Sequence, residues 1–211
     1  MALKIAIIGG GSAYAPGLLH AFIQNAEAFA GAEFALMDIA ARELDIVQRL
    51  SSKMAVSSGA ALDIRAYSDR QAALADADYV LTTFRQGGFE ARHQDEAIPL
   101  QYDVIGQETI GPGGFFFAMR TLPVIRAMVE EIKQVAPRAV LVNYTNPTQI
   151  VAEAVTHFSE LPCISICDQS YDDQRKILHA MALEPDSVQL ESIGLNHATW
   201  STRFTIDGKT A

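Results

Sequence analysis

The first residues of this chain constrain its fold more than any other part. An apolar run over residues 3–8 ends in a glycine-rich turn, and a helical pattern over 18–23 follows. The turn residues are Gly9, Gly10, Gly11 and Ser12. This order predicts a strand, a tight turn and a helix, an arrangement that binds a pyrophosphate on backbone amides. Tyr14 stands where the usual G-x-G-x-x-G pattern has its third glycine, and Gly17 follows three residues later. Alone, the turn is weak evidence for a dinucleotide site.

A second predicted strand, over 34–37, strengthens the dinucleotide interpretation. It ends at Asp38, 27 residues after Gly11. A carboxylate at this place accepts two hydrogen bonds from an adenosine ribose, and its charge repels a 2′-phosphate, which favours NAD over NADP. The structural alternative makes Asp38 the N-cap of a helix over 40–52, and the two roles are compatible.

Strand and helix patterns alternate along most of the chain. Further strands are expected at 62–67, 79–84, 139–144 and 163–166, and further helices at 115–135, 148–158 and 172–182. Because most of these strands are apolar throughout, they predict a mostly parallel sheet with helices on both faces. We therefore expect an α/β, Rossmann-like domain related to lactate and malate dehydrogenases.

The pattern changes near residue 185. Residues 187–193 alternate as a half-exposed antiparallel strand does, 199–205 resemble another, and Asp207-Gly208 is typical of a hairpin turn. We expect an NAD-binding domain over 1–184 and the beginning of a truncated α+β substrate domain over 185–211.

Charge and composition narrow the class of partner. The net charge of −9 argues against nucleic acid and anionic membranes, and no apolar run reaches the roughly 20 residues that cross a bilayer. The two cysteines suit a reducing compartment, and no export signal is visible. These features predict a cytoplasmic protein.

The segment 85–114 has no clean periodicity and is too long for an ordinary connection. It follows a strand of the predicted sheet, where open parallel sheets bind ligands. Arg85, Arg92 and Glu108 offer polar contacts for a hydroxylated or phosphorylated substrate. A solvated surface excursion is the alternative.

Three later residues complete the candidate site. Asn146 precedes Pro147 at the end of a strand, where it either caps the next helix or lies beside a nicotinamide. Cys167 follows the sixth strand, and His197 lies thirty residues on. A thiolate and an imidazole can share Mn²⁺, Fe²⁺, Co²⁺ or Ni²⁺, although two ligands alone are a weak signal. A buried inert cysteine and a structural histidine are the alternative.

Taken together, these segments resemble the NAD- and metal-dependent glycosidases of glycoside hydrolase family 4. The resemblance rests on motifs in a fixed order: 9–12, 84–92, Asp95-Glu96 with 98–100, 105–109, 111–114, Asn143-x-x-Asn146-Pro147, Cys167-Asp168 and 194–197. Members of this family are about twice this length, so the chain resembles an N-terminal half.

The resemblance implies a reaction without net redox change. NAD⁺ takes a hydride from C3 of the sugar, a base removes the C2 proton, the glycosidic oxygen leaves by elimination, water adds, and the hydride returns. It implies a divalent metal, Mn²⁺ or a similar ion, on Cys167 and His197. It also makes Asp168 a candidate acid for the departing oxygen, and a phosphorylated glucoside the substrate.

Two cues for the anomer conflict. Asp168 is typical of 6-phospho-α-glucosidases, whereas 84–109 is more similar to 6-phospho-β-glucosidases, and we favour the β anomer slightly. The family's catalytic tyrosine and a phosphate-binding arginine are expected beyond Ala211, so the chain alone is expected to bind NAD without turnover. A homodimer or homotetramer is expected at full length. The alternatives are a 2-hydroxyacid dehydrogenase and a non-catalytic NAD-binding module.

Overall fold

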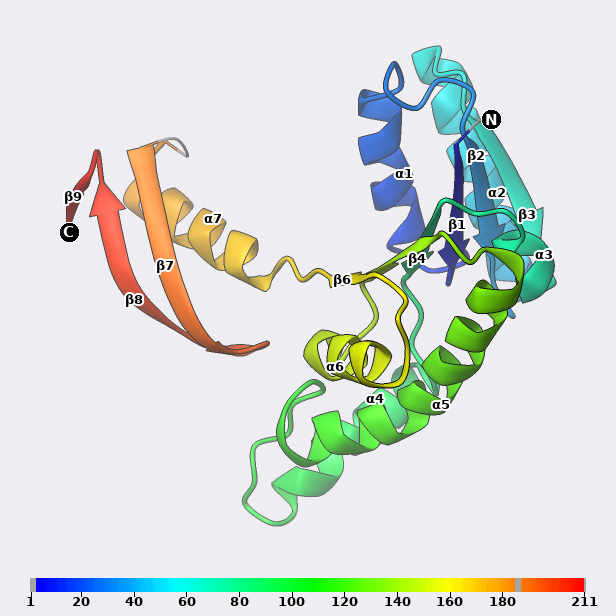
Figure 1. The fold of residues 1–211 in the computed structure, drawn as a ribbon. Coiled ribbons are helices and arrows are strands. Elements are labelled where there is room, and N and C mark those ends of the chain that lie inside the picture. The colour runs from blue at the N-terminus through cyan, green and yellow to red at the C-terminus, as the bar shows by residue number, and fades with distance from the viewer. Residues whose placement is uncertain (1–2, 185–186, 211) are drawn as a thin grey trace.

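The protein forms a six-stranded parallel sheet covered by helices, followed by a smaller antiparallel sheet (Figure 1). The computed structural model describes residues 3–184 and 187–210. The strands of the large sheet are β1 (Lys4–Ile8), β2 (Glu33–Met37), β3 (Asp63–Tyr67), β4 (Tyr79–Thr82), β5 (Val140–Asn143) and β6 (Cys163–Ser165). Their order is β3-β2-β1-β4-β5-β6, so the direction of winding reverses between β1 and β4. The expected Rossmann-like α/β fold is confirmed.

Two hydrophobic cores lie on the two faces of this sheet. Ile5 and Ile7 of β1 belong to one core and Ala6 and Ile8 to the other, because successive strand side chains point to opposite faces. The first core includes α1 (Ala15–Gln24) and α2 (Ala41–Ser58), and the second α3 (Arg70–Leu74), α5 (Gly111–Val135) and α6 (Thr148–Phe158). The central strands β2, β1, β4 and β5 are therefore covered on both sides, as their continuous apolar runs predicted, whereas the edge strands β3 and β6 are partly exposed.

The expectation of an irregular segment over 85–114 is wrong for more than half its length. Helix α4 (Gly88–Leu100) and the first residues of α5, from Gly111, lie within it. Helix α4 has no apolar stripe because its buried residues are Asp95 and Pro99, while Phe89 and Ile98 are exposed. Periodicity alone could not detect such a helix.

Helices α5 and α2 also extend further than expected. Helix α5 begins at Gly111 rather than at residue 115, because Pro112 in the first turn does not interrupt helical hydrogen bonding. Helix α2 continues to Ser58 rather than ending at 52, and Gly59, with φ of 72°, ends it.

The second sheet is a hairpin of β7 (Val188–Leu195) and β8 (Ala198–Ile206), extended by β9 (Lys209–Thr210). The predicted turn at Asp207-Gly208 is confirmed, since φ is 48° at Asp207 and 75° at Gly208. Helix α7 (Gln169–Met181) lies beside this sheet (Figure 1), and Gln174 donates a 3.3 Å hydrogen bond to the Val188 carbonyl. The domain boundary predicted between 184 and 185 touches residues 185–186, outside the described ranges.

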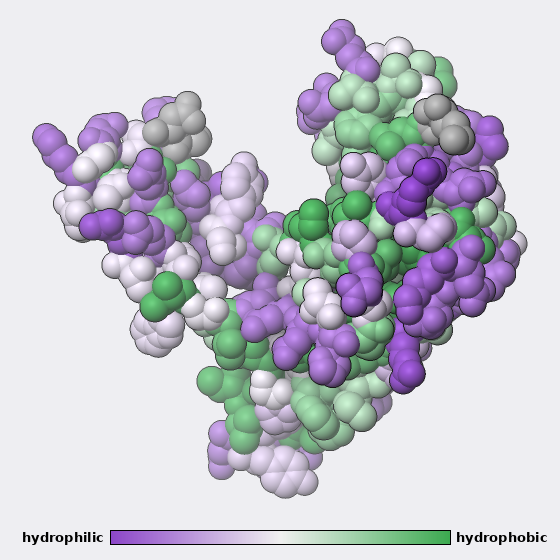
Figure 2. Space-filling view, in the orientation of Figure 1, coloured by the Kyte–Doolittle hydropathy of each residue, from purple (hydrophilic) through white to green (hydrophobic). Residues whose placement is uncertain are grey.

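Apolar side chains gather on the outer face of α4, of the loop after it and of the first turns of α5 (Figure 2). The exposed members are Ile98, Leu100, Tyr102, Val104, Ile105, Phe115, Phe116 and Met119. Within residues 3–184 and 187–210, no helix combines the length and the apolar character needed to cross a bilayer.

Candidate functional site

A cavity of about 870 Å³ opens at the carboxyl ends of the parallel strands. Its lining comes from the turn after β1, the end of β2, the segments after β4 and β5, the start of α7 and the tip of the β7–β8 hairpin. All but one of the candidate residues line it: Gly9, Gly11, Ser12, Asp38, Arg85, Arg92, Glu108, Asn146, Cys167, Asp168 and His197. Residues 188 positions apart in the sequence are thus brought to one site.

The glycine turn follows β1 and lies beside the end of β4, where the winding of the sheet reverses. Gly9 has φ of 95°, and a Cβ there would lie 2.6 Å from the carbonyl carbon of Thr83. Both conditions require glycine. Gly10 does not line the cavity, because it packs against β2, where an added Cβ would lie 2.8 Å from Leu36 Cβ. The N–H of Gly11 donates to Asp38, and the Oγ of Ser12 is buried with no partner among the described residues.

Asp38 ties the turn to the end of β2. Its Oδ2 accepts the N–H of Gly11 at 2.9 Å, and its Oδ1 accepts the N–H of Ala40 at 3.0 Å. The N-cap interpretation is wrong, because Ala40 is the N-cap of α2 and no side chain caps the helix. Each carboxylate oxygen keeps a second lone pair that can face a ligand in the cavity.

Asn146 also does not cap a helix. Pro147 is the N-cap of α6, and the Asn146–Pro147 peptide is cis. The Oδ1 of Asn146 is buried and has no partner among the described residues, although Asn146 lines the cavity. A buried acceptor without a donor is costly, so this amide is suited to a hydroxyl donor from a ligand.

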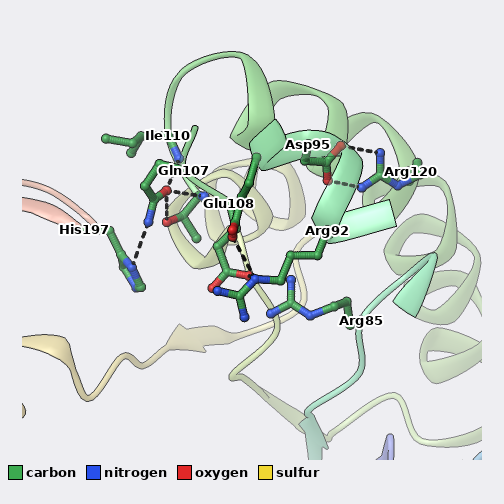
Figure 3. A network of polar contacts seen from close by, with 10 residues as sticks. Arg85, Arg92, Asp95, Gln107, Glu108, Ile110, Arg120 and His197 are labelled. Atoms are coloured by element: carbon green, nitrogen blue, oxygen red, sulfur yellow. Dashed lines mark hydrogen bonds and ion pairs between the residues drawn. The ribbon is translucent and has the colours of Figure 1, made fainter. Parts of the chain in front are cut away.

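Glu108 joins two arginines at the cavity wall (Figure 3). Its Oε2 lies 2.5 Å from Nη1 of Arg85 and 3.4 Å from Nε of Arg92, and its side chain is only 12% exposed. Arg92 also donates a 2.8 Å hydrogen bond to Glu96, and this bond raises the pKa of Arg92. The guanidinium of Arg85 lies 4.9 Å from the ring centre of Phe117. The carboxylates of Glu96 and Glu108 therefore offset the positive charges of the two arginines.

Cys167 and His197 meet across 30 residues of sequence. Sγ of Cys167 lies 3.5 Å from Nε2 of His197, which stands at the tip of the β7–β8 hairpin with φ of 106°. This spacing suits two ligands of one ion, because bonds from zinc to sulfur and nitrogen, for example, are about 2.3 and 2.1 Å long. Within the described ranges, no three His, Cys, Asp or Glu residues gather as a complete metal site. Both cysteines are free thiols, and burial raises the pKa of Cys163.

Asp168 contacts a second cavity residue. Its Oδ2 accepts a 2.6 Å hydrogen bond from the hydroxyl of Tyr144. The ring of Tyr14 lies edge-on to that of Tyr144, with centroids 5.8 Å apart. A carboxylate and a phenol thus stand next to Cys167 on the cavity wall.

Comparison with known proteins identifies the family. The model of the family 4 glycosyl hydrolases matches residues 4–183. The chain belongs to this family. A probable 6-phospho-beta-glucosidase of Bacillus subtilis (strain 168) is 41% identical to this family 4 chain. The match covers 98% of this chain and 47% of the Bacillus protein. A 6-phospho-alpha-glucosidase from gut microorganisms, solved in complex with NAD and Mn²⁺, is 30% identical with a TM-score of 0.89, over 100% of this chain and 49% of that one.

The family 4 chain therefore spans about half the length of these relatives. A lactate dehydrogenase from Eimeria maxima is 17% identical, with a TM-score of 0.72 over 99% of this chain and 58% of that one. This last likeness shows a shared fold alone. Family membership thus separates this chain from the dehydrogenases that share its sheet.

Three polar residues in or beside this candidate site were not predicted as site residues. Asn143 is fully buried. Its side chain forms hydrogen bonds with side chains of β4 and β6 and with a backbone carbonyl of the segment after β5. Tyr144 and Gln107 contact Asp168 and His197. The position of Asn143 and Tyr144 at the end of a parallel strand was the available signal, whereas nothing local to Gln107 indicates that it reaches residue 197.

Proposed function

We propose that the protein containing this chain hydrolyses 6-phospho-glucosides by transient oxidation of the sugar, using NAD and a divalent metal. One observation carries the proposal: a single cavity is lined by the glycine turn with Asp38, by the Cys167–His197 pair and by the ion-paired arginines. When bound, NAD supplies a hydride acceptor and donor, and the metal polarises sugar oxygens and so acidifies the C2 proton.

The glycine turn is the proposed NAD site, formed by Gly9, Gly10, Gly11, Ser12 and Asp38. The fit rests on the backbone of Gly9, which leaves no space for a Cβ, and on the Oγ of Ser12, which has no partner within the described part of the chain. Gly10 contributes by shaping the turn rather than by contact. Asp38 favours a free ribose hydroxyl over a 2′-phosphate, since like charges repel.

The pairing of Arg70, a cation in the cavity wall, supports NAD over NADP as well. Arg70 lines the cavity, but Glu131 holds it through two hydrogen bonds of 2.6 and 2.7 Å. A guanidinium already paired in this way is not available to neutralise a 2′-phosphate. The carboxylate of Asp38 is therefore the dominant charge for the adenosine ribose.

Cys167 and His197 are the proposed metal ligands. The thiolate and imidazole donors suit a first-row transition metal, and a substrate with neighbouring hydroxyls can supply further ligands. Donor chemistry alone does not distinguish Mn²⁺ from Fe²⁺, Co²⁺ or Ni²⁺. We propose Mn²⁺ because the similar 6-phospho-alpha-glucosidase was solved with that ion.

The sugar is proposed to bind Arg85, Arg92, Glu108 and Asn146. The unpartnered Oδ1 of Asn146 accepts a sugar hydroxyl, and Glu108 can accept another. The cluster carries little net charge, because Glu96 and Glu108 balance the two arginines. A phosphate at this cluster therefore gains little unless a further cation also contacts it.

Asp168 is the proposed acid for the departing oxygen. Tyr144 keeps its proton at neutral pH, because burial and the Asp168 carboxylate raise its pKa well above the usual value for tyrosine. The Tyr144–Asp168 hydrogen bond orients the carboxyl group of Asp168, which must itself carry the proton that it gives to the departing oxygen. Tyr144 therefore supports Asp168 and is not proposed as the base that removes the C2 proton.

We favour the β anomer of the substrate. The relative named a probable 6-phospho-beta-glucosidase is 41% identical to this chain, against 30% for the 6-phospho-alpha-glucosidase structure. Asp168 supports the α anomer instead, so both substrates belong in the test.

The proposal further includes a cytoplasmic location, a domain boundary between 184 and 185, and a homodimer or homotetramer. The apolar face over α4 and α5 is the kind of surface that subunit contacts cover.

The decisive experiment uses the longer protein that contains this chain. Chromogenic 6-phospho-β- and 6-phospho-α-glucosides are incubated with NAD⁺ and Mn²⁺, and both cleavage and NADH are followed. We expect cleavage without net NADH, faster for the β substrate, and a loss of at least a thousandfold in His197→Ala. Net NADH from a 2-hydroxyacid without glycoside cleavage would instead establish a dehydrogenase.

The 211-residue chain provides a second test. Calorimetric titration is expected to show NAD binding, and no glycoside turnover is expected. Binding of NAD that ignores Mn²⁺ and glucose 6-phosphate, together with an inactive longer protein, would favour the non-catalytic module.

A further inference from the structure

Gln107 connects the loop before α5 to the hairpin that carries His197 (Figure 3). Its Oε1 accepts the N–H of Thr109 at 2.5 Å, the hydroxyl of Thr109 at 2.7 Å and the N–H of Ile110 at 2.9 Å. Backbone N–H groups only donate, so the atom facing them must be the amide oxygen. The NH₂ group of Gln107 therefore points the other way and lies 3.3 Å from Nδ1 of His197.

The N–H donor that Gln107 presents to Nδ1 determines which ring nitrogen of His197 carries the proton. Nδ1 must accept the hydrogen bond from Gln107, so the neutral ring is protonated at Nε2. That nitrogen is the one that lies 3.5 Å from Sγ of Cys167. The ring therefore directs an N–H group, rather than a lone pair, toward the thiol.

A histidine that binds a metal through Nε2 normally donates its Nδ1–H to a carboxylate or a carbonyl. Gln107 presents the opposite polarity, and three hydrogen bonds to its oxygen oppose a flip of the amide. We propose that Gln107 is a positioning residue that keeps Nδ1 of His197 unprotonated and thereby weakens divalent metal binding at Cys167 and His197. Metal binding then requires the Gln107–His197 hydrogen bond to break. The metal part of this inference rests on the proposed function.

The tautomer is measured without any metal. Nitrogen-15 NMR of the metal-free protein at a pH of about 8, where an ordinary histidine is neutral, reports the protonation of each ring nitrogen. The signals of His197 are those absent from His197→Asn. We expect protonated Nε2 in the wild type and protonated Nδ1 in Gln107→Glu. Protonated Nδ1 in the wild type would overturn the proposal.

Metal affinity is measured by electron paramagnetic resonance of free Mn²⁺. In Gln107→Glu, one carboxylate oxygen can still accept from Thr109 and Ile110 while the other accepts Nδ1–H. Gln86→Glu is the charge-matched control, because Gln86 lines the same cavity from the segment after β4. Changes to a residue that hydrogen-bonds a metal ligand alter metal affinity about 10–100-fold, so we expect Gln107→Glu to bind Mn²⁺ at least tenfold more tightly than Gln86→Glu.

Equal affinity of the two variants would overturn the proposal, because charge alone would then explain any gain. A role of Gln107 limited to anchoring the loop predicts no gain at all. Absence of Mn²⁺ binding by all three proteins would overturn the proposed metal site, and with it the effect on affinity. The tautomer measurement distinguishes that failure from a failure of Gln107 to position the ring.

Discussion

The hydroxyl of Tyr144 donates a 2.6 Å hydrogen bond to Oδ2 of Asp168, which joins the end of β5 to the start of α7. Both residues line the cavity. Burial makes the larger contribution to the raised pKa of Tyr144, and the Asp168 carboxylate adds to it. The pair is therefore sensitive to alkaline pH.

Replacing Tyr144 with Phe should reduce the loss of stability at high pH. The pKa of Tyr144 is higher in the folded protein than in the unfolded chain, so its contribution is present below a pH of about 10 and is lost as the pH rises further. Urea unfolding between pH 8 and pH 11 measures this. We expect a shallower decline for Tyr144→Phe than for the wild type, and an unchanged decline for the exposed control Tyr171→Phe. Parallel curves for Tyr144→Phe and the wild type would contradict the assignment.

Replacing Gly9 with Ala should impair both folding and NAD binding. The new methyl group would meet the Thr83 carbonyl at 2.6 Å in a backbone with φ of 95°. Such strain costs about 1–3 kcal/mol of unfolding free energy, and we expect at least a tenfold loss of NAD affinity by calorimetry. Gly17→Ala is the control, since it lies in α1 with open space around it, and should stabilise the protein by about 0.5–1 kcal/mol. Normal NAD binding by Gly9→Ala would separate this turn from the cofactor.

The sequence predicted the architecture well because the apolar strands and the glycine turn are local signals. Alternation of strand and helix gave the parallel sheet, and Asp207-Gly208 gave the hairpin turn. Helix α4 was missed because its buried face is made by Asp95 and Pro99, and the hydropathy pattern therefore has no helical period. Tertiary contacts, rather than an apolar stripe, hold this helix in place.

The site was predictable only in part for a related reason. Residues at strand ends, such as Asp38 and Cys167, converge once the sheet is known. The contacts of Gln107 with His197, and of Glu108 with Arg85, depend on how a loop folds over the sheet. Nothing in residue spacing indicates these contacts.

Replacing Asn143 with Ala should destabilise the junction of β4, β5 and β6. Its Oδ1 accepts a 2.8 Å hydrogen bond from Thr82, and its Nδ2 donates to the Thr145 carbonyl and to Ser165 at 3.0 Å. Loss of these bonds leaves buried groups unpaired, so we expect a cost of about 2–4 kcal/mol in urea unfolding. The exposed amide control Gln134→Ala should change the unfolding free energy by less than about 0.5 kcal/mol. A cost for Asn143→Ala as small as that of the control would show that the network contributes little.

Arg120 of α5 forms an ion pair with Asp95 of α4. Replacing Arg120 alone with Met should destabilise the contact between these helices more than replacing both Arg120 and Asp95. Both Nη atoms of Arg120 hydrogen-bond the carboxylate of Asp95, whose side chain is 6% exposed. Arg120→Met leaves that carboxylate buried and unpaired, which costs about 3–5 kcal/mol of unfolding free energy. Asp95→Asn combined with Arg120→Met removes the unpaired charge, so the double variant should be more stable than Arg120→Met alone. The exposed pair of Arg49 and Asp45 supplies the control, and Arg49→Met should cost less than about 1 kcal/mol. Additive costs in the double variant would indicate that Asp95 and Arg120 stabilise the helices independently.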